Sequence, residues 1–134
     1  MKREERLTKP QEFSQVYTKG LSKASRLLVL RALPNNLPHS RFGFSVSKRV
    51  GNAVTRNHIK RLLREIAPRI PIKSPNDIVF IVRPAAADSD FHMLSKEVEQ
   101  LLSRAGLLLN DEPGSARKRD SLITGGPEQK NGNR

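Results

Sequence analysis

The sequence predicts an α+β fold, a small two-layer sandwich with the element order α-β-β-α-β-α. Three observations predict it. Apolar residues alternate with small ones over 41–47, which is typical of a strand with one buried face. The run DIVFIV at 77–82 is apolar almost throughout and predicts a strand buried on both faces or nearly so. Between them, apolar residues at helical spacing over 53–67 predict a helix.

A first helix is expected after residue 8, because Thr8 and Gln11 have the spacing of a capping box and Pro10 suits a first turn. The apolar residues that follow at helical spacing, until Gly20 stops the helix, are Phe13, Val16 and Tyr17. The Leu- and Val-rich run 26–33 predicts the first strand, and PNNLP at 34–38 predicts a turn.

Two further helices are expected. The central one follows a Gly51-Asn52 turn, begins near Ala53 and ends at Ala67, before a proline. Its core stripe comprises Ile59, Leu62, Leu63 and Ile66. Asp90 is the expected N-cap of the last helix, whose apolar positions are Phe91, Leu94, Val98, Leu101, Leu102 and Ala105.

The charge balance predicts a polyanionic partner. The 134 residues include 25 Lys and Arg against 13 Asp and Glu, a net charge of +12, and this favours nucleic acid or an acidic membrane surface. No cysteine is present, which excludes disulfides and thiolate metal sites. The charged N-terminus lacks a signal-peptide h-region, and no apolar run approaches the length of a membrane span. We therefore expect a soluble, cytoplasmic protein that does not cross a membrane.

Residues 110–134 have the composition of a disordered tail, with four Gly, two Pro and no aromatic residue. This segment contributes five cations and four anions, or +1, so the remaining +11 belongs to a domain at 1–109. Residues 41–66 alone contribute seven cations and one Glu, or +6. The positive charge is therefore concentrated in the domain expected to fold.

The central helix is expected to carry a basic face beside its core stripe. Arg56, Lys60 and Arg64 are spaced i, i+4, i+8, and Asn57 and Arg61 form the next row outward. A solvated charged surface is the simpler alternative. Against it, a single acid interleaves with these cations, so salt bridges one turn apart cannot neutralise them.

The turn before this helix extends the basic face. Lys48 and Arg49 precede the turn, and unpaired backbone N–H groups near Asn52 add positive charge at the helix start. Several phosphates can then be contacted at once, which predicts binding to a nucleic-acid backbone.

The stretch RFGFSVSKRVGNAVTRNHIKRLLREI, residues 41–66, resembles the signature of the bacterial ribonuclease P protein subunit. In that family a G-N-A-V turn leads into an Arg- and Asn-rich helix. The resemblance covers roughly 3–105, and its flanking matches are Arg6, Leu7, Phe13, Tyr17 and Gly20 upstream and DIVFIVRPAA, 77–86, downstream. It implies a ribosomal S5 domain 2-like sandwich with a left-handed βαβ crossover, against the usual right hand.

The resemblance also implies a function. The family's protein joins a catalytic RNA that removes 5′ leaders from precursor tRNA, with Mg²⁺ acting through the RNA. No catalytic residue, metal ligand, membrane partner or protein oligomer is implied for the protein itself. The expected RNA-subunit contacts are Lys48, Arg49, Asn52, Arg56, Asn57, Lys60, Arg61 and Arg64. The chain departs from the family at His58, where Arg is usual, which removes one cation from that position.

The family's leader-binding cleft matches Phe13 and Tyr17, whose rings offer a flat surface to unstacked bases. The alternative is that this pair plugs the core. Arg31 stands where the family often has another aromatic residue on a strand, so leader binding here is expected to rely more on charge.

Other functions are weaker alternatives. A structural RNA-binding protein, such as a ribosomal component, would use the same basic helix but needs no exposed Phe13 and Tyr17. A protein-only nuclease would need clustered acids for metal ions, and Glu65 is the lone acid between Glu12 and Asp77. The cluster DSDFH at 88–92 is better explained by helix capping than by metal binding.

Overall fold

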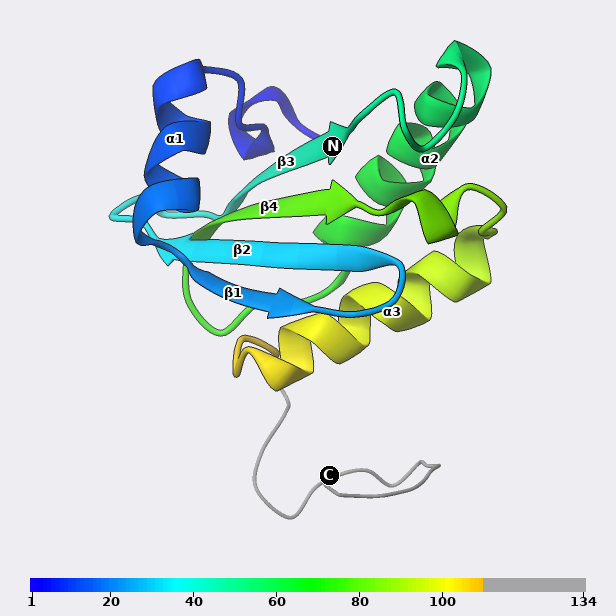
Figure 1. Ribbon diagram of the computed structural model, residues 1–134. Coiled ribbons are helices and arrows are strands. Elements are labelled where there is room, and N and C mark those ends of the chain that lie inside the picture. The colour runs from blue at the N-terminus through cyan, green and yellow to red at the C-terminus, as the bar shows by residue number, and fades with distance from the viewer. Residues whose placement is uncertain (110–134) are drawn as a thin grey trace, which may run out of the picture.

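The computed structural model describes residues 1–109, and the predicted tail at 110–134 lies outside them. Within this range the helices and strands are α1 (Pro10–Lys19), β1 (Leu21–Ala24), β2 (Leu28–Pro34), β3 (Arg41–Val46), α2 (Ala53–Ile66), β4 (Asn76–Val82) and α3 (Phe91–Arg104). Single 3-10 turns lie at Arg3–Glu5, Ala67–Arg69 and Pro84–Ala86. The α+β class and the three expected helices are confirmed (Figure 1).

The strands of the described chain form one sheet in the order β1-β2-β4-β3. β4 lies between an antiparallel neighbour, β2, and a parallel neighbour, β3. Phe80 at its centre is opposite Leu30 on one side and Phe44 on the other. Because parallel neighbours need a crossover connection, α2 links β3 to β4 as predicted. The left hand of this crossover stays a prediction from the family resemblance.

β1 is one strand more than the sequence predicts. It pairs antiparallel with β2, and Leu21 lies opposite Ala32. All four of its residues are exposed, so no alternation of apolar and polar residues marks it as a strand. Its conformation is fixed by pairing with β2, an interaction that a local sequence pattern does not encode.

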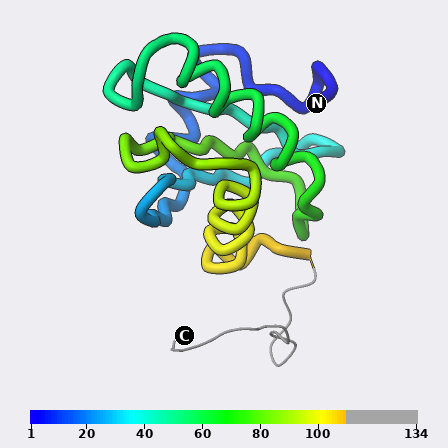
Figure 2. The backbone as a smooth tube through the Cα atoms, turned by 90° about the vertical axis from the view of Figure 1, so that its right-hand side faces the viewer, coloured from blue at the N-terminus to red at the C-terminus, as the bar shows by residue number. Residues whose placement is uncertain are grey.

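The sheet separates two apolar cores. On one face Ile59 of α2 and Leu101 of α3 pack into the same cluster as Leu30. On the other face Val16 of α1 packs with Val79 of β4 in a smaller cluster. The larger core is the predicted two-layer sandwich, in which α2 and α3 contact each other, and α1 adds a partial layer on the opposite face (Figures 1 and 2).

The start of α1 differs from the prediction. Its N-cap is Lys9, and the capping side chain is Glu12 instead of the Thr8–Gln11 pair. One carboxylate oxygen of Glu12 accepts hydrogen bonds from the backbone N–H groups of Thr8 and Lys9, both at 3.1 Å. A charged acceptor at the positive end of a helix stabilises it more than a neutral hydroxyl does.

Gly20 ends α1, as predicted, but for a different reason. Its φ of −78° lies outside the left-handed region that usually favours a glycine at a helix end. Instead, a Cβ there would lie 2.5 Å from the carbonyl oxygen of Val16 and 2.7 Å from that of Ala32. Glycine is therefore required because the chain passes close to backbone atoms.

The last helix begins where the sequence predicts. Asp90 Oδ1 accepts the backbone N–H of Met93 at 2.9 Å. The predicted apolar stripe is buried except at its two ends: Ala105 is half-buried, and Phe91 is exposed, with the Arg69 guanidinium 5.8 Å from its ring centroid. In residues 1–109 no helix is long and apolar enough to cross a bilayer.

Candidate RNA interface

The basic face expected on the central helix lies on α2, and the buried side of the helix sets its direction. Ile59, Leu63 and Ile66 are buried in the larger core, and Leu62 is half-buried against it. Because successive residues are 100° apart around a helix, the cations interleaved with these positions are carried to the flanks and outer side of α2. The core therefore holds these cations in a fixed orientation.

The cations of α2 differ in exposure. Arg61 and Arg64 are exposed, whereas Arg56 and Lys60 are half-buried. The Arg56 Nε donates to the carbonyl oxygen of Gly51 at 3.1 Å, which holds the guanidinium at the helix start. This bond uses one of five guanidinium N–H groups, so Arg56 keeps donors for an anion.

No carboxylate neutralises these cations within the part of the chain that the structure describes. Glu65, the acid on α2, pairs with Arg69 at 3.6 Å. The remaining ion pairs of residues 1–109 both involve Arg41, which lies on β3. The cations of α2 therefore keep their charge for an external anion.

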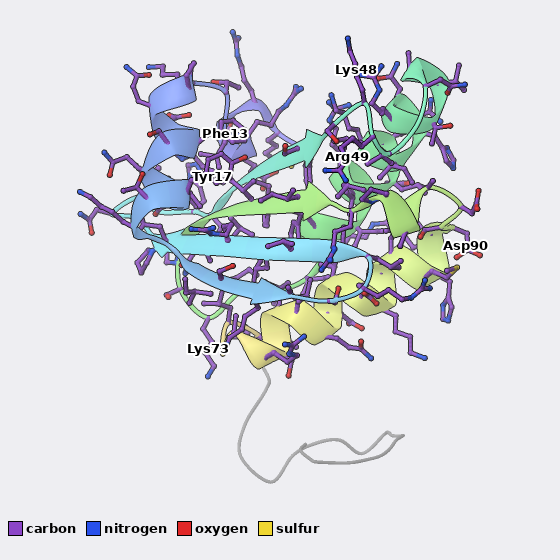
Figure 3. The ribbon with its side chains drawn as sticks, in the orientation of Figure 1. Phe13, Tyr17, Lys48, Arg49, Lys73 and Asp90 are labelled. Atoms are coloured by element: carbon purple, nitrogen blue, oxygen red, sulfur yellow. The ribbon has the colours of Figure 1, made fainter. Side chains whose placement is uncertain are left out.

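The loop between β3 and α2 adds two further cations. Lys48 and Arg49 are exposed there, at the opposite end of the sheet from Phe13 and Tyr17 (Figure 3). We call the whole set the basic face; its members are Lys48, Arg49, Asn52, Arg56, Asn57, Lys60, Arg61 and Arg64.

Asn52 has a structural role within the basic face. Its Oδ1 accepts the backbone N–H of Thr55 at 3.0 Å and caps α2. Its side-chain carbonyl is therefore occupied, and the exposed side chain can offer a ligand its amide N–H groups.

Val54 was missed by sequence reasoning. It lies in the first turn of α2 and is 78% exposed, which is unusual for an aliphatic side chain. Its helical phase was the available signal, since five residues place it about 140° from the buried Ile59. It presents an apolar contact beside the cations of the basic face.

Phe13 and Tyr17 form the second predicted surface, on the side of α1 that faces β3 (Figure 3). Their ring centroids are 6.3 Å apart, with planes tilted by 45°. Phe13 is half-buried and packs over Gly43, where a Cβ would lie 2.6 Å from two of its ring atoms. Tyr17 is 38% exposed. Core packing thus explains part of the role of Phe13, whereas the Tyr17 side chain contributes little to the core.

Arg31, on β2, reaches the same surface. Its Nη2 donates to the backbone carbonyl of Tyr17, in the last turns of α1, where a cation is favoured by the helix dipole. Its Nε is buried and has no hydrogen-bond partner among residues 1–109. The structure therefore brings together the three residues predicted for leader binding, which we call the leader surface: Phe13, Tyr17 and Arg31.

Sequence reasoning missed an ion-pair cluster at the N-terminal end of α1 entirely. Arg41 Nη1 donates to Glu12 Oε2 at 2.7 Å. Its Nε and Nη2 donate to the two carboxylate oxygens of Asp77, at 2.9 and 2.7 Å. Asn35 Nδ2 donates to the same carboxylate at 2.7 Å. The only sequence signal was an Arg and an Asp at the starts of two strands that the fold makes neighbours.

The cluster favours the charged forms of Glu12 and Arg41. Burial acts to raise the pKa of Glu12, but the backbone N–H groups of Lys9 and Thr8 and the Arg41 charge outweigh it and lower that pKa. The hydrogen bonds from Arg41 to Asp77 raise the pKa of Arg41, against the opposing effect of burial. Both groups are therefore ionised at neutral pH.

The other aromatic residues of β3 and the nearby His39 have structural partners. Phe42 is buried, and Phe44 stacks on Phe80 with centroids 6.3 Å apart, as expected for core residues. His39 Nε2 hydrogen-bonds the carbonyl of Glu4 at 2.8 Å. Over residues 1–109, no group of three or more His, Asp or Glu side chains is placed to hold a metal ion.

Comparison with known proteins identifies the family. The family model named Ribonuclease P matches residues 1–106. A ribonuclease P protein component of Dehalococcoides mccartyi (strain CBDB1) is 42% identical over 120 residues, covering 90% of this chain and 100% of that protein. The one from Alkaliphilus metalliredigens (strain QYMF) is 44% identical over 105 residues, covering 76% and 90%.

Solved structures agree. A Staphylococcus aureus RNase P protein mutant, described as having defective mRNA degradation activity, has a TM-score of 0.74 at 37% identity, covering 79% of this chain and 92% of that chain. The Thermotoga maritima RNase P protein has a TM-score of 0.67 at 31% identity, covering 75% and 96%. Since the family model and these relatives cover most of the described fold, the chain belongs to the family of bacterial ribonuclease P protein components, subunits of a tRNA 5′-processing endoribonuclease.

Proposed function

We propose that this chain binds the catalytic RNA of ribonuclease P through its basic face and the 5′ leader of precursor tRNA through its leader surface, and so assists endonucleolytic removal of the leader. The observation that carries the proposal is the unneutralised row of cations that the core holds on one side of α2. Such a row binds a phosphate backbone whatever its sequence, which suits a structured RNA partner.

The chemistry of the basic face fits this role. Guanidinium groups donate two parallel hydrogen bonds to a phosphate, and Arg56, Arg61 and Arg64 supply three of them from one helix. Lys48 and Arg49 extend the contact beyond the helix start. The proposal therefore expects several phosphates of one RNA to be bound together.

The leader surface fits a single strand. The exposed ring of Tyr17, next to Phe13, offers a stacking platform that an unpaired base fills and a base inside a duplex does not. One N–H group of Arg31 donates to the Tyr17 carbonyl, and the other N–H groups of its guanidinium can donate to a leader phosphate. Mature tRNA, which lacks the leader, would leave this surface unused.

In this proposal the Mg²⁺ ions and the phosphodiester hydrolysis belong to the RNA, in the bacterial cytoplasm. The side chains of this protein bind and orient the two RNAs. No catalytic residue and no metal ligand is assigned to residues 1–109.

Reconstituted cleavage tests the proposal. A precursor tRNA with a 5′ leader is incubated at low Mg²⁺ with the protein, with its cognate RNA subunit, and with both. Cleavage by the pair, with little by either alone, is the expected result. Cleavage by the protein alone would mean an active site in the protein, and absence of stimulation would favour a structural RNA-binding protein.

The leader surface is tested separately with Phe13→Ala. The ratio of affinities of the reconstituted enzyme for leader-bearing and mature tRNA is expected to fall, while affinity for the RNA subunit is unchanged. Equal losses for both tRNAs would assign Phe13 to the core instead.

A further inference from the structure

The Arg41 cluster joins three parts of the fold through one guanidinium. Asp77 belongs to β4, Arg41 to β3 and Glu12 to α1. The side chains of Arg41, Glu12 and Asp77 are only 21%, 20% and 10% exposed, respectively, so solvent screens their interactions little. The cluster is thus a fixed link between α1 and the sheet.

The sheet holds the Arg41 side of this link independently of α1. Asp77 binds Arg41 through two parallel N–H···O bonds, which fix the plane of the guanidinium as well as its position. Asn35 in turn orients the Asp77 carboxylate. The remaining Nη1 is thereby directed to Glu12, the member of the cluster that α1 contributes.

Glu12 is well placed to control the leader surface. One of its oxygens binds Arg41 while the other caps α1 through Thr8 and Lys9. The next residue is Phe13, whose ring packs over Gly43, two residues after Arg41 and on the same face of β3. Two adjacent contacts, one ionic and one aromatic, therefore dock the first turn of α1 on β3.

We infer that Glu12, held by the Arg41–Asp77 pair, is a positioning residue for leader binding: it fixes the place and rotation of α1 so that Phe13 and Tyr17 present their rings together. The inference rests on the proposed function of the leader surface. Glu12 touches neither RNA; it acts through the helix that carries the rings. Without this link, α1 is oriented by the half-buried Phe13 ring, the buried Val16 and the hydrogen bond from Arg31 to the Tyr17 carbonyl, none of which holds the first turn of the helix through an ion pair.

The test uses Glu12→Gln, which keeps the shape of the side chain and removes its charge. The measured quantity is the ratio of affinities of the reconstituted enzyme for leader-bearing and mature tRNA. We expect the ratio to fall roughly 3- to 10-fold, within the loss that removal of one stacked base produces. Arg41→Lys keeps a cation but cannot bridge two carboxylates in the same geometry, so it should lower the ratio similarly.

Glu5→Gln is the matched control. Glu5 also accepts a backbone N–H at the start of a helical turn, from Lys2 at 2.8 Å, but forms no ion pair with the sheet in the described structure. Its replacement should leave the ratio unchanged. Circular dichroism and the affinity for the RNA subunit show whether each variant remains folded. A variant that loses its helical signal and its affinity for the RNA subunit is replaced by Asp77→Asn, which weakens the hold of the sheet on Arg41.

The double variant separates positioning from a general loss of stability. In a Phe13→Ala background, Glu12→Gln should lower the ratio by less than it does in the native chain, because only the Tyr17 ring is left to position. An undiminished effect there, or an unchanged ratio in Glu12→Gln alone while Phe13→Ala lowers it, would overturn the inference. If Phe13→Ala itself leaves the ratio unchanged, the proposed leader surface fails instead.

Discussion

At the scale of single residues, Gly43 shows how a missing side chain makes room for a candidate binding group. A Cβ there would lie 2.6 Å from two Phe13 ring atoms, closer than packed atoms allow. These atoms are the far end of a half-buried side chain, so the ring can swing away while the backbone stays in place. A side chain at position 43 would therefore displace the Phe13 ring more than it would disturb the backbone.

Gly43→Ala is accordingly expected to cost about 1 kcal/mol of unfolding free energy, the lower end for overpacking. The preference for leader-bearing over mature tRNA should fall roughly fivefold or more, because the displaced ring no longer stacks with a base. Urea denaturation and the two tRNA affinities measure these effects. A fall in stability of several kcal/mol with unchanged preference would show that Phe13 serves the core alone.

Glu12 makes stability depend on pH. Its pKa is lowered in the folded protein, so the folded state gains stability from the carboxylate at neutral pH and loses it as pH falls through that pKa. Glu12→Gln should be less stable than the native chain by about 1 to 2 kcal/mol at neutral pH. The difference should shrink below the usual glutamate pKa of about 4.3. Denaturation curves from pH 7 to 3 measure it, and a constant difference would contradict the assigned role of the charge.

At the scale of elements, α2 combines a structural and a binding side on one helix. Ile59 and Leu63 are buried, whereas Arg61 and Arg64 are exposed and form no ion pair within residues 1–109. Substituting the exposed cations should therefore change RNA affinity without changing the fold. Because the fold is unchanged, the salt dependence of RNA binding reports how many phosphates these cations contact.

If about five phosphates are bound, log affinity for the RNA subunit should fall with log salt with a slope of about −3.5 to −4.5. The double variant Arg61→Ala, Arg64→Ala should flatten this slope by about 1.4 to 1.8, since two contacts are lost. Lys96→Ala, which removes an exposed cation from α3, is the control and should leave it unchanged. Parallel slopes for all three proteins would rule out phosphate contacts by Arg61 and Arg64.

Elements with their own periodicity or helix caps could be predicted from the sequence. Elements and contacts that depend on a segment distant in the sequence could not. The periodicity of α2 and the Asp90 cap of α3 are local, and both are confirmed. β1 has four exposed residues and exists by pairing with β2. The Glu12–Arg41 contact spans 29 residues of sequence, so only the docking of α1 on β3 reveals it.

The same reason limits what the sequence shows of the candidate site. The members of the basic face share one helix and its preceding loop, so their common surface follows from helical phase. Arg31 is distant from α1 in sequence, and its bond to the Tyr17 carbonyl depends on β2 lying beside the end of that helix. The family resemblance supplied the role expected of Arg31, and the structure supplied its partner.

At the scale of the whole molecule, the two candidate surfaces rest on different cores. α2 packs with α3 on one face of the sheet, and α1 packs in the smaller cluster on the other. The labelled members of each surface lie at opposite ends of the sheet (Figure 3). In the proposed function the protein therefore contacts two RNAs through surfaces that share no residue.

This separation predicts that the two surfaces act independently. Effects of substitutions at distant sites with no shared partners add, usually within about 0.5 kcal/mol. We expect Phe13→Ala and Arg64→Ala to lower the affinity of the protein for a preformed complex of RNA subunit and precursor tRNA by amounts that add in the double variant. Repeating the cycle with mature tRNA should abolish the Phe13→Ala effect and leave that of Arg64→Ala. A coupling above about 1 kcal/mol would instead show that the sheet transmits binding at one surface to the other, since no side chain of either surface is shared.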